Sequence, residues 1–404
     1  MSAPMLANPA AVNVPAQAAT PDLDALLSEG MIGPRDGAGR TCVVAMSGGV
    51  DSAVTALVMR ERGYRVVGIN LRLFSPDDAD HRANPCCGIP AMDDARMTCA
   101  GLGIPFYAIN MESEFSRAVI DNFVDAYAAG QTPNPCLECN RHVKFRHLVE
   151  RARLLGADCL ATGHYARILP GDPDRGVPHR LFRAVDPDKD QSYVLHTMSQ
   201  DQLGFVRFPL GNLRKTEVRA LAHAFALPVA DKAESQEICF VGKRSYADFV
   251  AARRPDAARP GVVVDASGQR LGEHRGLVHH TVGQRRGLGL PGPEPRFVLR
   301  LEPAANRVVV GSRAEAAARR ITADGFTLIR GDWPAAAFDA DAVVRYRGAP
   351  TPASITLDPA GGGATVTFPG DGPIASPGQA IVLYRGDEVL GGGTIRGVTT
   401  RSAP

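Results

Sequence analysis

A short glycine-rich segment, Ser47-Gly48-Gly49-Val50-Asp51-Ser52, constrains the fold of this chain more than any other feature. It follows the apolar run 42–46 and precedes a stretch in which Val54, Leu57 and Val58 repeat at helical spacing. Two glycines let the backbone curl tightly, and the helix would point its free N–H groups and positive end at the loop. The segment therefore predicts a phosphate-binding turn between a strand and a helix. An ordinary tight turn with a serine cap is the alternative.

Alternating segments after this loop predict a parallel sheet. Strand-like runs at 64–73, 105–109 and 158–162 alternate with helical patterns at 92–102, 115–127 and 142–155. Strands joined by crossover helices form a parallel sheet with both faces covered, and ligands bind beyond the carboxyl ends of its strands. We therefore expect the loops after Met46, Leu73 and Thr162 to line one site.

The chain changes character beyond about residue 242. Gly and Pro become frequent, and turn signals separate short runs of Val, Leu and Ile at 261–265, 296–299, 342–347, 364–368 and 380–384. Short strands at this spacing predict small barrels or sandwiches. We predict four regions: a disordered tail over 1–35, an α/β domain over 36–242, a small central β-rich domain over 243–314 and a C-terminal β-barrel domain over 315–404.

Composition excludes a membrane span and a uniformly basic protein. No stretch approaches the ~20 apolar residues of a membrane helix, and the uncharged residues 1–20 lack the basic region of a secretion signal. The formal net charge is only +2, yet residues 141–153 hold five basic side chains against one acidic, and 205–219 hold four against one. We expect a cytoplasmic protein that would hold nucleic acid through local basic patches, with an affinity that weakens with salt.

Two cysteine segments supply candidate nucleophiles. Cys136 and Cys139 lie in 134–140, which begins with a proline turn and leads into the basic stretch from Arg141. Nearby cations and a helix N-terminus favour the thiolate form of cysteine. Cys239 lies where the α/β half joins the β half. In a chain without an export signal, such cysteines indicate reactive thiols or metal ligands more often than structural disulfides.

The cysteines leave a metal site open as an alternative. Cys86 and Cys87 together with Cys136 and Cys139 would supply four thiolates for zinc or an iron–sulfur cluster. The adjacent spacing of Cys86 and Cys87 is poor for tetrahedral zinc, so we predict no such metal. Cys136 could also act as a resolving thiol beside Cys139.

The glycine-rich segment is not a Walker A loop, because it lacks the lysine of that motif. It resembles the PP-loop of ATP pyrophosphatases, which split ATP between the α and β phosphates. This resemblance implies ATP as a co-substrate and places Asp51 where it would hold Mg²⁺ or orient the pyrophosphate. An amidating ligase with a PP-loop and a tRNA-binding protein with a vestigial loop are two other classes. An amidating ligase has no need of paired cysteines 100 positions apart, and the intact loop from Ser47 to Ser52 argues against a metal-bound tRNA-binding protein with a vestigial loop.

Six motifs in register resemble the tRNA-specific 2-thiouridylase family. They are residues 46–52, 134–140, 161–165, 190–193, 235–240 and the pair of segments within 272–289. The resemblance runs from about Thr41 to Tyr384. It implies a PP-loop ATP-pyrophosphatase catalytic domain followed by two small β-rich domains. It also implies insertion of sulfur at C2 of the wobble uridine, U34, in the anticodon stem-loop of tRNA.

The resemblance also implies roles for individual residues. ATP would adenylate the uracil O2. Cys239 would carry a persulfide from an upstream sulfur donor, a cysteine desulfurase or sulfur-relay protein, and Cys139 would release that sulfur and form a transient disulfide with Cys239. Matched ATP contacts are Ala45, Met46, Ser47, Gly48, Gly49, Val50, Asp51, Ser52, Leu71 and Gly163. Matched tRNA contacts are Asn134, Pro135, Cys136, His164, Lys189, Asp190, Gln191, Arg345, Tyr346 and Gln379. Many family members carry another residue where this chain has Cys136.

Overall fold

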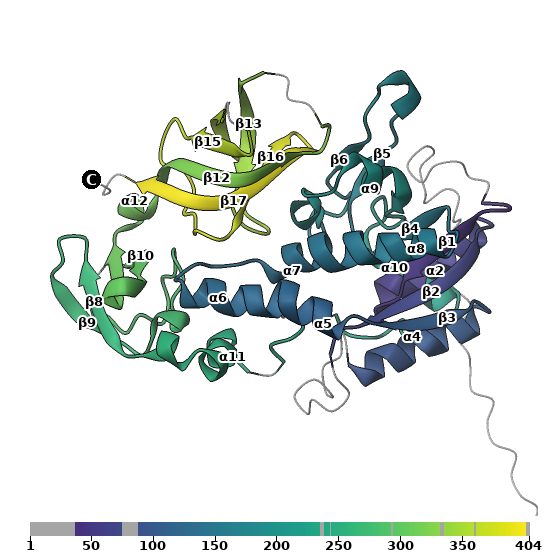
Figure 1. The fold of residues 1–404 in the computed structure, drawn as a ribbon, viewed down its shortest axis with the longest axis horizontal. Coiled ribbons are helices and arrows are strands. Elements are labelled where there is room, and N and C mark those ends of the chain that lie inside the picture. Colours follow the sequence, from purple (N-terminus) through teal and green to yellow (C-terminus); the bar gives the residue numbers. More distant parts are fainter. Residues whose placement is uncertain are drawn as a thin grey trace, which may run out of the picture.

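The computed structural model describes residues 37–74, 88–234, 238–242, 244–291, 294–331, 335–358 and 361–400. The predicted tail over 1–35, Cys86, Cys87 and part of the motif at 235–240 lie outside this range. Figure 1 shows three sheets, with the parallel sheet at one end of the molecule and the central sheet at the other. No helix in the described ranges is long and apolar enough to cross a membrane.

The first sheet is parallel throughout and confirms the alternation seen in the sequence. Its strand order is β3-β2-β1-β4-β7. The bounds are β1 Thr41–Ala45, β2 Arg65–Arg72, β3 Phe106–Asn110, β4 Cys159–Ala161 and β7 Val206–Arg207. Since β1 lies at the centre, the loop that follows it opens at the middle of the carboxyl edge, where such folds bind ligands.

Helices cover both faces of this sheet because side chains along β1 alternate between them. Cys42 and Val44 pack with α2 Val50–Glu61, α4 Ile89–Gly101 and α10 Lys215–Ala224. On the other face Val43 packs with η2 Cys139–Leu148, α8 Val149–Leu154 and α9 Gln200–Phe205. The short helix α7 Pro135–Glu138 leads directly into the π-helical segment η2. This two-sided burial gives β1 its uninterrupted apolar sequence.

A helical arm extends from the sheet toward the central domain. It comprises α5 Glu112–Phe115, the π-helical η1 Ser116–Asp121, α6 Asn122–Ala128 and, later in the chain, α11 Tyr246–Arg253. Phe115, Val119, Phe123 and Tyr127 all pack in one buried cluster, which confirms the helical spacing predicted from the sequence. The arm therefore carries an aromatic core of its own.

The central domain is a four-stranded sheet with a small separate core. Its order is β10-β11-β8-β9, and only the β11–β8 pair is parallel. The strands are β8 Gly261–Asp265, β9 Arg270–His274, β10 Phe297–Glu302 and β11 Arg307–Gly311. Short helices accompany it: η5 Pro255–Ala258, η6 Leu277–His279, η7 Pro303–Ala305 and α12 Arg313–Ala316.

The C-terminal strands form a barrel that closes between β12 and β17. Its strands are β12 Ala318–Leu328, β13 Ala337–Val343, β14 Thr351–Leu357, β15 Gly363–Thr367, β16 Ala380–Arg385 and β17 Glu388–Thr400. The predicted strand at 342–347 is wrong beyond Val343. The chain turns there, since Arg347 has a left-handed φ of 57°, and residues 345–347 leave the sheet.

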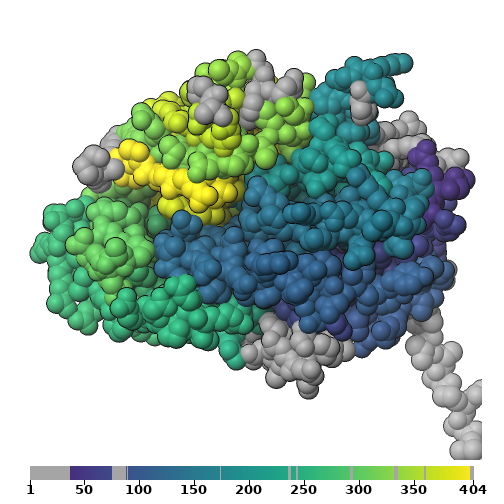
Figure 2. All heavy atoms as spheres, viewed as in Figure 1, coloured from purple at the N-terminus to yellow at the C-terminus, as the bar shows by residue number. Residues whose placement is uncertain are grey.

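A hairpin from the first domain joins this barrel. The strands β5 Arg167–Leu169 and β6 Arg180–Phe182 continue the sheet beyond β17. The short helix η3 Pro173–Arg175 lies between these strands, and η4 Ser192–Leu195 follows them in the chain. Val343, Val382 and Tyr384 of the barrel share a core cluster with Val43 and Leu160 of the parallel sheet. Figure 2 shows the barrel seated against the first domain.

Candidate active site

The loop after β1 is shaped so that only glycine fits at its tip. Gly48 has a left-handed φ of 73°, and a Cβ there would lie 2.0 Å from the carbonyl oxygen of Ala91 in α4. Ser52 Oγ donates to the carbonyl of Gly49 at 2.9 Å and accepts from Ser47 N at 3.2 Å. The Ser52 side chain therefore holds the loop in a tight turn. The free N–H groups at the N-terminus of α2 lie next to this turn.

Asp51, in the first turn of α2, is held by two donors on one oxygen. Tyr165 Oη donates to Asp51 Oδ1 at 2.7 Å, and Lys215 Nζ donates to the same atom at 2.6 Å. Burial, reinforced by the Asp51 carboxylate, raises the pKa of Tyr165, so the phenol keeps its proton and remains a donor. A Cβ at Gly163 would lie 3.0 Å from Asp51 Cβ, so the loop after β4 also approaches closely.

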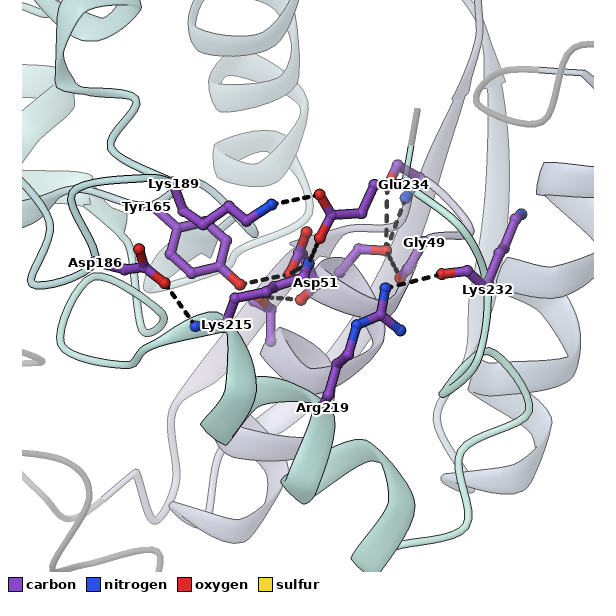
Figure 3. Close-up of polar contacts among 12 residues, drawn as sticks. Gly49, Asp51, Tyr165, Asp186, Lys189, Lys215, Arg219, Lys232 and Glu234 are labelled. Carbon is purple, nitrogen blue, oxygen red and sulfur yellow. Dashed lines mark hydrogen bonds and ion pairs between the residues drawn. The ribbon is translucent and has the colours of Figure 1, made fainter. Parts of the chain in front are cut away.

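A chain of charged side chains extends from Asp51, and Figure 3 shows it. Lys215 Nζ also lies 2.8 Å from Glu234 Oε1, while Lys189 Nζ donates to Glu234 Oε2 at 2.6 Å. Burial alone would raise the pKa of Glu234, but the hydrogen bonds from Lys189 and Lys215 outweigh it and lower that pKa to about 2. The carboxylate is therefore ionised at neutral pH.

A second lysine lies beside the glycine loop. Lys232 Nζ donates to the carbonyl of Gly48 at 2.9 Å and to Asp94 Oδ2 at 2.5 Å. No local motif marks Lys215, Lys232 or Glu234 as site residues, because tertiary folding brings them to the loop from more than 160 positions away. Their presence means that cations flank the loop although the loop itself contains none.

The structure brings Cys139 and Cys239 into one apolar cluster although they are 100 positions apart. Cys139 begins η2 and is 8% exposed, and Cys239 is partly buried and packs against the same hydrophobic cluster. Leu71 and Ile109, near the carboxyl ends of β2 and β3, pack against this cluster. The cluster that contains the two predicted thiols therefore reaches the edge of the sheet where the glycine loop opens.

Asn134 begins the helix that carries Cys136 and Cys139. Its Oδ1 accepts a hydrogen bond from Leu137 N at 3.2 Å, and Pro135 occupies the first helical position. Cys136 is exposed, whereas Cys139 is buried one turn later. The structure thus assigns the two cysteines different surroundings.

Family models match nearly all of the described chain. They are a tRNA methyl transferase HUP domain over residues 40–243, a tRNA methyl transferase PRC-barrel domain over 247–312 and an aminomethyltransferase β-barrel domain over 318–395. The tRNA-specific 2-thiouridylase MnmA of Methylobacterium radiotolerans is 50% identical over 371 residues, which cover 89% of this chain and 94% of the relative. The chain belongs to the tRNA-specific 2-thiouridylase family.

Other members of the 2-thiouridylase family extend the match. The protein of this name from Chloroflexus aurantiacus is 47% identical over 358 residues, covering 87% of this chain and 97% of the relative. Among solved structures, the U34-tRNA thiolase of Methanococcus maripaludis, described with its [4Fe-4S] cluster, is 16% identical. It covers 59% of this chain and 70% of its own, with a TM-score of 0.34, too low to support a functional argument. The PP-loop fold and the two β-rich domains agree with the sequence-based prediction.

The tRNA contacts expected for this family gather mostly where the barrel meets the first domain. The ring of Tyr346 lies 6.3 Å from that of Tyr193, and Arg347 donates to the carbonyl of Asp188 at 2.6 Å. Thr132 N donates to the carbonyl of Pro377 at 2.8 Å, which brings the 131–136 region beside Gln379. A cavity of about 270 Å³ at this junction is lined in part by Asp190, Tyr193 and Tyr346.

Several of these expected tRNA contacts make hydrogen bonds within the protein. Asp190 is buried and accepts from Ala184 N and from Ser192 Oγ, and Gln191 Oε1 accepts from Tyr165 N at 3.1 Å. His164 is 9% exposed and lies 2.7 Å from Thr162 Oγ1. Burial holds its pKa well below the usual range, so the ring is neutral. Their contacts with tRNA remain predictions.

The described residues contain no group of three or more His, Cys, Asp or Glu side chains placed to hold a metal ion. The four-thiolate alternative includes Cys86 and Cys87, which lie outside those residues. The glycine loop does fit a polyphosphate, because its narrow turn, the serine hydroxyls and the helix N-terminus converge between Lys215 and Lys232. Asp51 offers a carboxylate at the same place, which suits Mg²⁺.

Proposed function

We propose that this chain catalyses ATP-dependent 2-thiolation of U34 in tRNA, with s²U34, AMP and pyrophosphate as products. One observation carries the proposal: Cys139 and Cys239 lie in a single cluster that adjoins the strand edge bearing the phosphate-binding loop. Membership of the 2-thiouridylase family supports tRNA as the substrate. A persulfide donor and a cytoplasmic location remain predictions.

The ATP step would use the loop from Ala45 to Ser52 together with Leu71 and Gly163. Backbone N–H groups and the hydroxyls of Ser47 and Ser52 would bind phosphate oxygens, with Lys232 and Lys215 supplying positive charge. Asp51 would hold Mg²⁺, which when bound neutralises charge on the polyphosphate. Attack of the uracil O2 on the α-phosphate would release pyrophosphate and make O2 part of a good leaving group.

The sulfur step would use the two clustered thiols. The terminal sulfur of a persulfide on Cys239 would attack C2 of the activated uracil, and AMP would leave with O2. Cys139 would then attack Sγ of Cys239, breaking the bond to the transferred sulfur and releasing s²U34. This leaves a Cys139–Cys239 disulfide, which a thiol reductant must reduce before the next turnover.

The tRNA would bind across the junction between the barrel and the first domain. U34 must leave the base stack to reach C2 chemistry, and we propose that Asn134, Pro135 and Cys136 line its pocket. Lys189, Asp190, Gln191, His164 and the barrel residues Arg345, Tyr346 and Gln379 would contact the surrounding stem-loop.

The proposal is tested by thiolation of a tRNA transcript with ATP, Mg²⁺ and a persulfide donor. We expect s²U34 with wild-type protein and none with Cys239→Ser or Cys139→Ser. Cys99→Ser, a buried cysteine of the other helical layer, serves as the matched control and should retain activity. Thiolation by Cys239→Ser would refute the persulfide carrier. An inactive Cys136→Ser alongside an active Cys139→Ser would exchange the roles of the two cysteines.

A further inference from the structure

Glu234 lies between two lysines that belong to different parts of the proposed site. Its two carboxylate oxygens accept from Lys189 at 2.6 Å and contact Lys215 at 2.8 Å. Lys215 in turn donates to Asp51 at 2.6 Å. The four side chains form one series of alternating charges, and Figure 3 shows them meeting end to end.

The two lysines of this series lie on segments that Asp186 joins. The amide of Lys215, at the start of α10, donates to Asp186 Oδ2 at 2.8 Å, and Lys189 N donates to the carbonyl of Asp186 at 3.2 Å. The segment that carries Lys189 is thus joined to the start of α10 through the Asp186 carboxylate as well as through Glu234. The positions of the two lysines are therefore linked.

The charges are shielded enough from water to influence one another. The side chain of Lys215 is 11% exposed, and those of Glu234 and Lys189 are 24% and 26% exposed. Coulomb interactions between partly buried groups are several times stronger than in bulk water and less screened by salt. Removing one charge from the series therefore alters the pairing of its neighbours.

We propose that Glu234 is a positioning residue that couples Lys189 to the ATP loop, because it shares Lys215 with Asp51. The roles of the two ends rest on the proposed function, in which Lys189 contacts tRNA and Asp51 serves ATP. When Lys189 is absent, Glu234 has Lys215 as its remaining lysine and draws it from Asp51. ATP affinity then falls as a consequence of a change in the tRNA-contacting segment.

The coupling is measured with full-length protein as the affinity for ATP in Mg²⁺ without tRNA. Lys189→Gln should weaken ATP binding by about three- to tenfold, as expected for residues that share a partner. In the Glu234→Gln background the same substitution should change ATP binding by less than about twofold. Glu234→Asp, which keeps the carboxylate, should preserve a measurable effect of Lys189→Gln.

Arg347→Gln is the matched control. It removes one positive charge that contacts Asp188, in the same segment as Lys189, and should leave ATP affinity within about twofold of wild type. Equal effects of Lys189→Gln in both backgrounds would indicate simple long-range charge and overturn the inference, as would no effect in either. A wild-type protein that neither binds ATP nor thiolates tRNA would overturn the proposed function and the inference with it. Wild-type thiolation without the coupling would overturn the inference alone.

Discussion

At position 48 the backbone leaves no room for a side chain. Gly48→Ala would combine the strain of a left-handed φ with a Cβ 2.0 Å from the carbonyl oxygen of Ala91. We expect loss of ATP binding and a free energy of unfolding lowered by about 3 kcal/mol, measured by ligand titration and urea denaturation.

Gly39 provides the control for Gly48. Its φ is 75°, but a Cβ there would meet nothing within 4 Å. Gly39→Ala should therefore cost only the conformational strain, about 1 kcal/mol, and leave ATP binding unchanged. Equal losses for the two variants would contradict the close packing of α4 on the loop.

His196 makes stability depend on pH. Burial lowers its pKa from 6.5 to about 4, although a hydrogen bond with the Tyr193 carbonyl opposes the shift. The unfolded chain therefore takes up the proton first, so the His196 contribution is fully present above pH 6.5 and is lost as the pH falls toward 4. Its slope is at most about 1.4 kcal/mol per pH unit. Urea denaturation between pH 7 and 4.5 should show a smaller slope for His196→Gln. An identical slope would contradict the assignment.

Sequence reasoning at the residue scale found what local motifs encode. The glycine loop, Asp51 and the paired cysteines are marked by their immediate neighbours, and the structure places Cys139 and Cys239 in one hydrophobic cluster. Lys215 and Glu234 have no such local sign, because their function depends on which distant carboxylate or ammonium group the fold places beside them.

At the scale of elements, the hairpin β5–β6 is fastened to β17 by an ion pair. Arg180 donates to both carboxylate oxygens of Glu388, at 2.8 and 2.5 Å, and the Glu388 side chain is 8% exposed. Arg180→Gln should lower the free energy of unfolding by about 2 kcal/mol, because a shielded carboxylate loses its partner.

The barrel also supplies a surface pair for comparison. Arg396 and Asp324 lie 3.0 Å apart on neighbouring strands, but both side chains are more than half exposed. Arg396→Gln should change stability by no more than about 0.5 kcal/mol in the same denaturation experiment. A similar cost for the two substitutions would contradict the role given to the hairpin.

The elements that sequence reasoning missed are those whose residues are locally ambiguous. Strand β17 contains Gly391, Gly392 and Gly393, and a run of glycines is more typical of a turn than of a strand. In the barrel the glycines allow close approach, since a Cβ at Gly391 would lie 2.1 Å from the carbonyl oxygen of Thr327. Such a requirement depends on the partner strand and leaves no local pattern.

At the scale of the whole molecule, near-neutral charge conceals local basic surface. Arg146 and Arg151 are exposed on the helix that continues from Cys139. If tRNA phosphates lie along this helix, replacing both by Gln should reduce the slope of log affinity against log salt by about 0.9 for each. Filter binding over a range of KCl concentrations measures the slope. Arg175→Gln, at the tip of the β5–β6 hairpin, should leave it unchanged, and an unaltered slope in the double variant would place the tRNA elsewhere.

The sequence did not reveal which elements pack together in each hydrophobic core. Tyr384 and Val389 of the barrel lie in the same cluster as Val43 and Phe145 of the first domain, a contact that the sequence did not predict. Apolar periodicity shows that a face is buried but not which element covers it.

The central claim is that the ATP loop and the clustered thiols serve one reaction. Its most direct test is a single turnover in which protein persulfidated at Cys239 is mixed with tRNA in the presence or absence of ATP, and the sulfur is followed by mass spectrometry. We predict that ATP triggers both loss of the persulfide and formation of up to one s²U34 per chain, with a Cys139–Cys239 disulfide left behind. Formation of s²U34 without ATP, or from a sulfur that never resided on Cys239, would contradict it.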